Sequence, residues 1–324
     1  MKKKLWTWAR VLVSLVLMAL VLRNVNMGQA LQTLQHSDVP LLALAFFLNI
    51  MVTLLLAFRW KVLVKSQGLK VGYPRLVATY FTSLFFSNFL LSTIGGDLVR
   101  AYYVWKDTKK QAVAVASVLV ERLIGSFSLF TIALVSAALV GTQKGSREFL
   151  LAVGLVTAGF LFAVWLFFNR GFVGLLDRFL GSPSLFGLRM KGKNFYDSLH
   201  SYLDKKRAAL EVFGITVLLQ VVVILIWFIV GKALGFKLGL VVYFLYIPVI
   251  GLIGVLPVSI NAWGLQEWSV VGLFARSGLA KEEALILSVV IHLMVVATSL
   301  VGGITFLARG EKPGEIDVNK EGEG

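Results

Sequence analysis

The chain contains no cysteine among its 324 residues. Disulfide bonds, thiolate metal ligands, a cysteine nucleophile and lipid attachment to cysteine are therefore excluded. Charge is also scarce, because Asp, Glu, Lys and Arg make up 15% of the sequence while hydrophobic residues make up 58% and the mean hydropathy is +0.83. There is no phosphate-binding loop of the GxxxxGK(S/T) type, so this chain does not itself use ATP through such a loop. A composition so poor in charge is typical of integral membrane proteins.

Long apolar runs explain this composition. A helix needs about 20 apolar residues to cross a bilayer, and eight runs are close to or above that length: 5–22, 40–58, 76–94, 112–141, 148–168, 212–234, 239–260 and 284–307. The first run follows three lysines but contains Arg10 and lacks a small-residue cleavage site, so we expect a retained helix rather than a signal peptide. We therefore predict an all-α, polytopic membrane protein with a single transmembrane domain over 1–310.

Two segments fall outside the apolar runs. The polar insert at 169–211 is rich in Lys and Arg, and apolar residues recur in it at near-helical spacing: Phe195, Leu199, Tyr202, Leu203 and Leu210. The insert is either an amphipathic cytoplasmic helix lying on an anionic leaflet or a solvated cytoplasmic connector. The tail at 311–324 is rich in Gly and Glu, and we expect it to be a disordered cytoplasmic segment.

Positive charge concentrates on the cytoplasmic side of membrane proteins and discriminates between two topologies. With eight simple spans and a cytoplasmic N-terminus, Lys and Arg divide almost evenly, 16 inside and 15 outside. If 76–108 instead dips in from the cytoplasmic side and 239–276 dips in from the outer side, the counts become 24 and 7, with Arg122 left out because it lies within an apolar run. This second topology, with about six full spans, two re-entrant or broken segments and both termini cytoplasmic, obeys the rule. Eight simple spans remain the alternative.

Re-entrant segments that enter from opposite faces are typical of transporters built from inverted repeats. A loose internal match agrees with this, since STIGGDLVR at 92–100 aligns with SINAWGLQE at 259–267. Residues that interrupt a helix lie in both segments: Gly95, Gly96, Pro257, Ser259, Asn261 and Gly264. Broken backbone at membrane depth is tolerated where it is buried in protein or lines a water-filled cavity. The alternative is that the glycines and the proline merely permit close helix packing.

Five ionisable residues lie in or beside the apolar runs: Asp97, Arg100, Glu121, Arg122 and Glu267. A charge near the bilayer centre costs about 2.5 to 3.5 kcal/mol, so such residues usually pair or face a cavity. Asp97 can cap a helix that runs to Trp105, and the N-terminus of this helix, with Arg100 one turn on, would suit a phosphate. Glu121 and Arg122 point about 100° apart on a helix and cannot simply neutralise each other. Arg122 with Asp97 and Glu121 with Arg100 are plausible pairs.

Several of these polar residues also have a purely structural explanation. Asp97 and Arg100 could lie in a cytoplasmic loop, and a lone histidine such as His292 in an apolar run is more often a hydrogen-bonded packing residue than a proton relay. Arg59 and Trp60 follow an apolar run, at the membrane interface where basic and aromatic side chains act as anchors. No acidic pair is spaced for a metal and no Ser/His or Lys/His set lies near the charges, so we expect neither a metal nor another cofactor.

Four segments stand out by their order and spacing: FRWKVLV at 58–64, SNFLLSTIGGDLVRAYYVW at 87–105, ERLIG at 121–125 and LPVSINAWGLQE at 256–267. Together they resemble the flippase-like membrane family (UPF0104-type) that contains the transmembrane region of lysylphosphatidylglycerol synthases. The chain departs from the family pattern at Leu91 and Ser92, where Pro-Gly is common, and at Asn261 and Ala262, where glycine is usual.

The resemblance implies a lipid-handling protein of the bacterial or archaeal cytoplasmic membrane that moves lipids between leaflets. No hydrophilic domain that could accept an aminoacyl-tRNA follows the last apolar run. Synthase activity is therefore not implied, and we expect a protein that is not an enzyme.

These observations predict a lipid transporter, of the flippase or scramblase kind, whose two broken segments form a polar groove near the midplane. The groove would hold the headgroup of an anionic phospholipid or of a polyprenyl-linked lipid or glycolipid, with the acyl tails in the bilayer. Its expected residues are Asn88, Gly95, Gly96, Asp97, Arg100, Glu121, Arg122, Pro257, Ser259, Asn261, Gly264 and Glu267.

Two other functions stay open: an accessory protein for a lipid-modifying enzyme, and a membrane-embedded lipid transferase or hydrolase. The expected partners are membrane lipids, with a second copy of the chain or a lipid-modifying enzyme as further candidates. Nucleic acid is not an expected partner, because the bias of positive charge toward cytoplasmic loops explains the net charge of +15.

Overall fold

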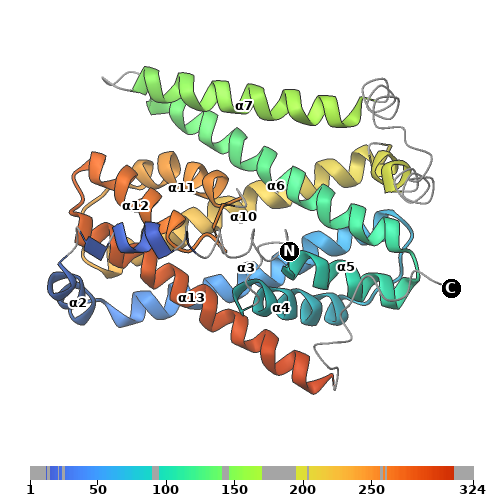
Figure 1. The fold of residues 1–324 in the computed structure, drawn as a ribbon, viewed down its shortest axis with the longest axis horizontal. Helices are drawn as coiled ribbons and strands as arrows, with labels where there is room; N and C mark the ends of the chain where they lie inside the picture. Colours follow the sequence, from blue (N-terminus) through green and yellow to red (C-terminus); the bar gives the residue numbers. More distant parts are fainter. Residues whose placement is uncertain are drawn as a thin grey trace.

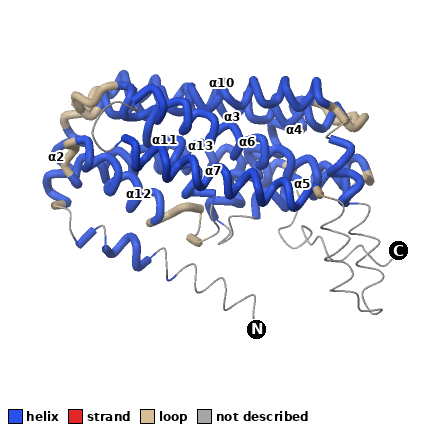
Figure 2. The backbone as a smooth tube through the Cα atoms, turned by 90° about the horizontal axis from the view of Figure 1, so that it is seen from above, coloured by secondary structure: helices blue, strands red, loops and turns tan. Residues whose placement is uncertain are grey.

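The computed structural model describes residues 12, 15–20, 22–23, 26–89, 95–140, 146–169, 195–202, 204–255, 258–259 and 261–309. Within these residues the chain forms helices joined by short loops, with no strand, which confirms the all-α prediction (Figure 1). Seen from above, most of the loops lie at the two ends of the helical bundle (Figure 2). Pro257, most of the first apolar run, much of the polar insert and the tail at 311–324 lie outside the described residues.

Among the described residues, four helices are long and apolar enough to cross a membrane: α3 (Val39–Ser66), α6 (Gln111–Val140), α10 (Lys206–Ala233) and α13 (Lys281–Ala308). A fifth apolar helix, α7 (Ser146–Phe168), packs on α6 and is 23 residues long. The start of α3 shows how the sequence sets these boundaries, because Asp38 Oδ1 accepts a hydrogen bond from the Leu41 N–H at 3.1 Å and Pro40 lies in the first turn.

A hairpin follows α3. Its helices are α4 (Tyr73–Phe89) and α5 (Gly95–Thr108). Arg75, near the start of α4, makes two hydrogen bonds to Asp107, near the end of α5, at 3.0 and 3.1 Å. The two helices touch at Gly96, where a Cβ atom would collide with the Ser83 carbonyl oxygen. The hairpin therefore returns to the end of the bundle from which it starts, which we call end A (residues 66–73).

A second hairpin follows α10. It consists of α11 (Leu240–Val255), α12 (Leu265–Phe274) and the single turn η2 (Ala275–Ser277). The Tyr246 hydroxyl is hydrogen-bonded to Ser277 Oγ at 3.1 Å, so this hairpin also returns to its own starting end. That end is end B (residues 233–240), which the Asp38 N–H joins through a 2.8 Å bond to the Ala233 carbonyl. The hairpins thus enter the bundle from opposite ends (Figure 1), as expected for two re-entrant segments and not for eight simple spans.

A short helix, α2 (Met27–Gln35), precedes α3 at end B and contacts α13. Asn26 caps it, because its Oδ1 accepts hydrogen bonds from the Gly28 and Gln29 N–H groups at 3.0 and 3.3 Å. The Asn26 N–H in turn donates to Glu282 Oε1, in the first turn of α13, at 3.2 Å. The start of α13 is therefore tied to end B.

The helices form two inverted copies of one pattern: a long helix, two short helices and a second long helix. The interval along the sequence from the start of α3 to the start of α10 equals the interval from α4 to α11. The interval from the start of α5 to the start of α12 likewise equals the interval from α6 to α13, and both are slightly longer than the first two intervals. α3 runs from end B to end A whereas α10 runs from end A to end B, so the copies point in opposite directions, as in inverted-repeat transporters.

The second copy has a short insertion at its break, between α11 and α12, which accounts for the longer interval. The sequence alignment that paired Arg100 with Glu267 therefore has the same register as the structure before the break. After the break its register is shifted by the insertion. By the positions of the helix starts, Asp97 corresponds to Glu267, since each is the third residue of its helix.

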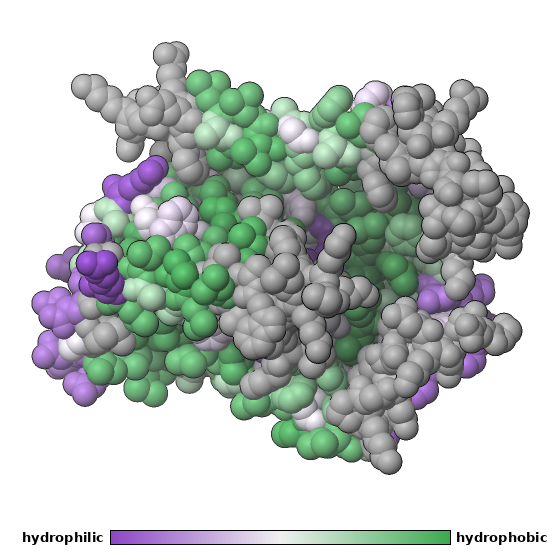
Figure 3. All heavy atoms as spheres, viewed as in Figure 1, coloured by the Kyte–Doolittle hydropathy of each residue, from purple (hydrophilic) through white to green (hydrophobic). Residues whose placement is uncertain are grey.

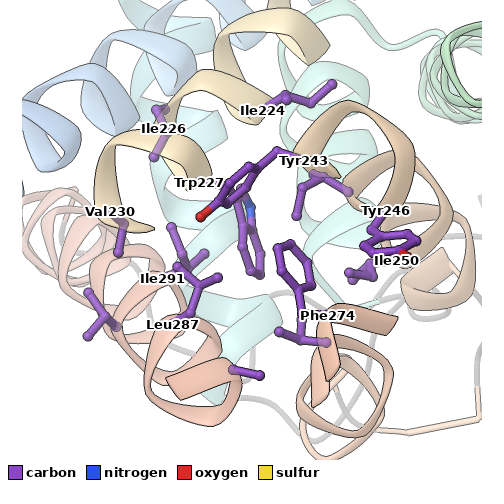
Figure 4. Close-up of a cluster of buried hydrophobic side chains, with 14 of the residues drawn as sticks. Ile224, Ile226, Trp227, Val230, Tyr243, Tyr246, Ile250, Phe274, Leu287 and Ile291 are labelled. Carbon is purple, nitrogen blue, oxygen red and sulfur yellow. The ribbon is translucent and has the colours of Figure 1, made fainter. Parts of the chain in front are cut away.

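The largest cluster of buried apolar residues in the described part of the chain lies mainly in the second copy (Figure 4). The rings of Trp227, Tyr243 and Phe274 gather there, and Leu287 and Ile291 of α13 close the cluster. On the outer surface, apolar residues cover much of the face in Figure 3, while hydrophilic residues gather at its left and right edges. This distribution suits a bundle whose flanks contact lipid and whose ends contact water.

The described part of the polar insert packs on the bundle. Leu199 and Tyr202 are buried in one cluster with Leu63 of α3 and Val212 of α10. Leu210 belongs to α10 and is exposed. The apolar positions of the segment 195–202 therefore contact neighbouring helices rather than a lipid leaflet.

Candidate functional site

The buried carboxylate of Glu121 is the centre of an ion-pair network. Its Oε1 accepts a hydrogen bond from Arg59 Nη2 at 2.5 Å, and its Oε2 accepts one from Arg100 Nη1 at 2.5 Å. The Glu121 side chain is only 2% exposed. Two charge-assisted hydrogen bonds offset part of the cost of removing this carboxylate from water. The pairing of Glu121 with Arg100 suggested by the sequence is present, and Arg59 is a second partner.

Asp97 extends the network to Arg122. Its Oδ1 accepts a hydrogen bond from Arg100 Nη2 at 2.7 Å, and its Oδ2 accepts one from Arg122 Nε, which is the other pair suggested by the sequence. The Arg122 side chain is 44% exposed and forms the accessible end of the network. Cations and anions alternate along Arg59, Glu121, Arg100, Asp97 and Arg122. Three guanidinium groups against two carboxylates leave one positive charge in excess.

The guanidinium group of Arg100 lies over the faces of two aromatic rings. Its guanidinium carbon lies 4.7 Å from the centroid of the Tyr80 ring and 5.2 Å from that of Trp60. Trp60 is in turn fixed by a hydrogen bond from its Nε1 to Ser117 Oγ at 3.2 Å. Cation–π contacts of this kind strengthen when they are removed from water, as they are here.

Arg59 and Trp60 are not the membrane-interface anchors that the sequence suggested. Both are buried, at 7% and 0% exposure. α3 continues to Ser66, so Arg59 lies within the helix rather than at its end, and its Nη1 also donates to Thr216 Oγ1 at 3.3 Å. Its Nε is buried without a hydrogen-bond partner among the described residues.

The first break places Asp97 differently from the cap that the sequence suggested. α5 begins at Gly95 and ends at Thr108, so Asp97 lies inside its first turn, and its carboxylate binds two arginines. An acidic side chain in a first turn still interacts favourably with the helix dipole. Gly95 is buried at the start of the helix, and Gly96 serves close packing against α4, as the structural alternative proposed.

The network lines a cavity of about 340 Å³ between the two copies. Its other polar lining residues are Tyr80, Ser83, Ser87, Ser126, Gln220 and Asn261. Gln220 was not among the residues predicted for the groove, although a lone glutamine inside an apolar run, such as this one, indicates a side chain that faces a cavity.

The tips of the two hairpins meet beside this cavity. Asn261 Nδ2 donates a hydrogen bond to Asn88 Oδ1 at 2.5 Å, and Asn88 Nδ2 donates to the Leu84 carbonyl at 3.1 Å. The structure therefore brings together six of the residues predicted for the groove: Asn88, Asp97, Arg100, Glu121, Arg122 and Asn261.

Glu267 forms a separate buried centre and does not line the charged cavity. Its Oε2 accepts a hydrogen bond from the Gly264 N–H at 2.7 Å, and its Oε1 lies 2.6 Å from His292 Nδ1. The indole of Trp263 stacks on the His292 ring with 3.9 Å between centroids. His292 is thus hydrogen-bonded and packed, as expected, while the structure separates Glu267 from the groove in which the sequence placed it.

A left-handed stretch of backbone precedes Glu267. Asn261, Ala262 and Gly264 have φ angles of 44°, 62° and 78°. Asn and Gly adopt this region readily, whereas Ala does so at a cost. Ser259 is fully buried in the same segment, and its Oγ has no hydrogen-bond partner among the described residues. Ser259 and Gly264 therefore shape the break rather than the cavity wall.

The internal repeat relates the two acid–base pairs. Asp97 and Arg122 in the first copy correspond to Glu267 and His292 in the second. Each pair joins the first turn of a short helix to the long helix that follows it. Over the described part of the chain, no three His, Asp or Glu side chains converge as metal ligands.

The chain resembles known membrane proteins along most of its length. A UPF0104 membrane protein of Methanothermobacter thermautotrophicus is 26% identical over 308 residues, which cover 88% of each chain. A UPF0104 membrane protein of Methanocaldococcus jannaschii is 27% identical over 128 residues, which cover 37% of this chain and 38% of the relative. The model of the family described as "Lysylphosphatidylglycerol synthase TM region" matches residues 7–303. The chain belongs to this lysylphosphatidylglycerol synthase transmembrane region family.

Proposed function

We propose that this protein is a lipid transporter that binds a phosphate-containing lipid headgroup in the charged cavity and moves it between leaflets. The observation that carries the proposal is the network from Arg59 to Arg122, which lines a cavity where two re-entrant hairpins meet. Guanidinium groups bind phosphate oxygens through two parallel hydrogen bonds. The single excess positive charge of the network favours a group with one negative charge.

Arg122 is the first arginine that an entering headgroup would meet, because Arg59 and Arg100 are buried and Arg122 is not. A phosphate beside Arg122 would compete with Asp97 for the same guanidinium. If Arg122 turned from Asp97 to the phosphate, Asp97 would still be paired with Arg100, and Arg100 would still be paired with Glu121. The network can therefore accept an anion without leaving a buried charge alone, which would be costly.

The two inverted copies supply a means of movement. In transporters of this architecture one copy tilts against the other, so that a central site opens alternately to each side. The charged cavity draws its wall from α3 to α6 of the first copy and from Gln220, Val255 and Asn261 of the second. Relative motion of the copies would therefore change access to the cavity.

The family description and the positive charges support a setting for this activity. The description names a phospholipid, and both relatives are called membrane proteins. We place the protein in the cytoplasmic membrane of a bacterium or archaeon with end A and both termini in the cytoplasm. With the three arginines of the network left out, this orientation puts 22 Lys and Arg inside and 7 outside. Anionic phospholipids and polyprenyl-linked or glycolipid phosphates are the substrates, and the activity is transport rather than catalysis.

Transbilayer movement of fluorescent phospholipids in liposomes containing the purified protein tests the proposal. The native chain should accelerate movement, and Arg122→Gln should slow it about tenfold, because one charge-assisted contact is lost. Lys65→Gln is the matched control, since it removes the same charge from an exposed position on α3 outside the cavity.

Two results would count against the proposal. If the native protein moves no lipid of any headgroup tried, an accessory role beside a lipid-modifying enzyme becomes the better explanation. If Arg122→Gln and the native chain move lipid equally fast, the charged cavity is not the route.

A further inference from the structure

A second cavity lies next to the charged one. It has a volume of about 260 Å³ and is bounded by residues of α3, α10 and α13, with Gln266 of α12. Leu56 of α3 and Leu84 of α4 line both cavities, so the two share a wall. A molecule held in the charged cavity therefore lies beside this second space.

The interior of the second cavity is apolar. Aliphatic and aromatic side chains such as Val223, Ile226 and Trp227 make up most of its wall. Asn49 Nδ2 already donates to Thr298 Oγ1 at 2.8 Å, and Gln266 Nε2 donates to Ser288 Oγ at 3.2 Å. Ordered water needs two to four polar partners, and polar groups with bonds inside the protein offer few of them. The cavity suits a hydrocarbon better than it suits water.

The internal repeat relates several lining positions of one cavity to those of the other. Arg59, Glu121 and Gly125 line the charged cavity, and their equivalents Ile226, Ile291 and Val295 line the second one. These equivalences follow from matching the start of α3 to that of α10 and the start of α6 to that of α13. The two cavities are therefore partly equivalent, and at the positions of Arg59 and Glu121 the second one carries isoleucines in place of charges.

We propose that the second cavity binds one hydrocarbon chain of the lipid whose headgroup occupies the charged cavity. This inference rests on the proposed function and adds a chain-binding site to it. The sequence suggested that both acyl tails stay in the bilayer, whereas here one tail passes the shared wall at Leu56 and Leu84 and lies against α10 and α13. The charged cavity matches the phosphate headgroup of a phospholipid, and the neighbouring apolar cavity matches one of its hydrocarbon chains.

Photocrosslinking tests this site directly. The probe is phosphatidylglycerol with a diazirine near the end of one acyl chain, added to the purified full chain in vesicles. After illumination, labelled peptides should map to 223–227 on α10 and 291–298 on α13. Labelling confined to outward-facing residues such as Leu218, Leu300 and Ile304, which are 59%, 49% and 68% exposed, would overturn the proposal.

Filling the cavity provides a second test. Val223→Trp should lower labelling of α13 and lipid movement about tenfold, because an overfilled cavity cannot admit the chain without strain. Leu218→Trp, on the outer face of the same helix, should leave both unchanged. Met294→Phe repeats the test from α13 if Val223→Trp does not fold.

The outcomes separate this inference from the proposed function. If native protein moves lipid and the filled variants move it at the native rate, the chain-binding site is wrong and the transport function stands. If native protein moves no lipid, the transport function is wrong. The chain-binding site then stands only if the labelled peptides still come from 223–227 and 291–298, and is otherwise wrong as well.

Discussion

Asn261 donates a hydrogen bond from its Nδ2 to Oδ1 of Asn88 at 2.5 Å, joining two residues that are 173 positions apart in the chain. Asn88 lies near the tip of the hairpin from end A, and Asn261 lies at the tip of the hairpin from end B. The bond therefore links the two inverted copies beside the charged cavity. If transport requires one copy to move against the other, this contact must change during the cycle.

Tying the two hairpin tips together should stop transport. Because the chain has no cysteine, Asn88→Cys combined with Asn261→Cys supplies a single reactive pair. A short, reducible thiol crosslinker should lower lipid movement to background, and reduction should restore it. Asn88→Cys alone, treated in the same way, is the control. Full transport by the crosslinked protein would mean that the tips stay together throughout the cycle.

Exchanging buried charges for the residues of the second copy should keep the fold and abolish transport. Ile226 and Ile291 stand at the positions equivalent to Arg59 and Glu121. Arg59→Ile with Glu121→Ile removes one cation and one anion, and Arg100 keeps its other carboxylate partner. A buried ion pair replaced by apolar residues is often neutral or stabilising, so we expect a free energy of unfolding within about 2 kcal/mol of native.

The single variant Glu121→Gln is the comparison for this exchange. It leaves two arginines without the carboxylate that they share and should lose about 3 kcal/mol or more. Unfolding in detergent measures both variants, and the liposome assay measures transport. If the double variant transports at the native rate, the network has a purely structural role. If it is as unstable as Glu121→Gln, removing Arg59 and Glu121 together does not avoid the cost of an unpaired buried charge.

The ion pairs of Arg122 with Asp97 and of Arg100 with Glu121 could be predicted because a charge inside an apolar run needs a partner and few candidates exist. The role of Arg59 could not be predicted in this way. An arginine followed by tryptophan after an apolar run looks the same at a membrane interface and inside a bundle, and its burial depends on how α6 lies against α3.

The two hairpins could also be predicted from the sequence, because the distribution of Lys and Arg favoured re-entrant segments over eight simple spans. The register of the internal repeat could not be predicted from the sequence. SINAWGLQE at 259–267 aligns Glu267 with Arg100, and the similarity is too low to reveal the short insertion at the second break. Only the starts of the helices show that Glu267 corresponds to Asp97 and His292 to Arg122.

Relieving the left-handed backbone at Ala262 should stabilise the protein. Its φ of 62° costs an L-residue about 1 kcal/mol or more, whereas glycine adopts it freely. Ala262→Gly should raise the free energy of unfolding by roughly 0.5 kcal/mol, a gain limited by the greater freedom of glycine in the unfolded chain. Ala138→Gly, at an exposed position in α6, should lower it by about 1 kcal/mol. Equal destabilisation by both, measured with denaturant in one detergent, would contradict the left-handed turn.

Removing the base of the second acid–base pair should affect stability more than transport. His292→Ala would leave Glu267 Oε1 with Ser288 Oγ at 3.4 Å as its remaining side-chain contact, so we expect a loss of about 3 kcal/mol because a buried carboxylate loses its main partner. His292→Gln retains a donor and should recover part of that loss. Because neither residue lines the charged cavity, folded His292→Gln should move lipid at the native rate, in contrast to Arg122→Gln at the equivalent position. A His292→Gln protein that is stable but inactive would instead place the Glu267–His292 pair in the transport cycle, so unfolding and lipid movement must be measured on the same preparation.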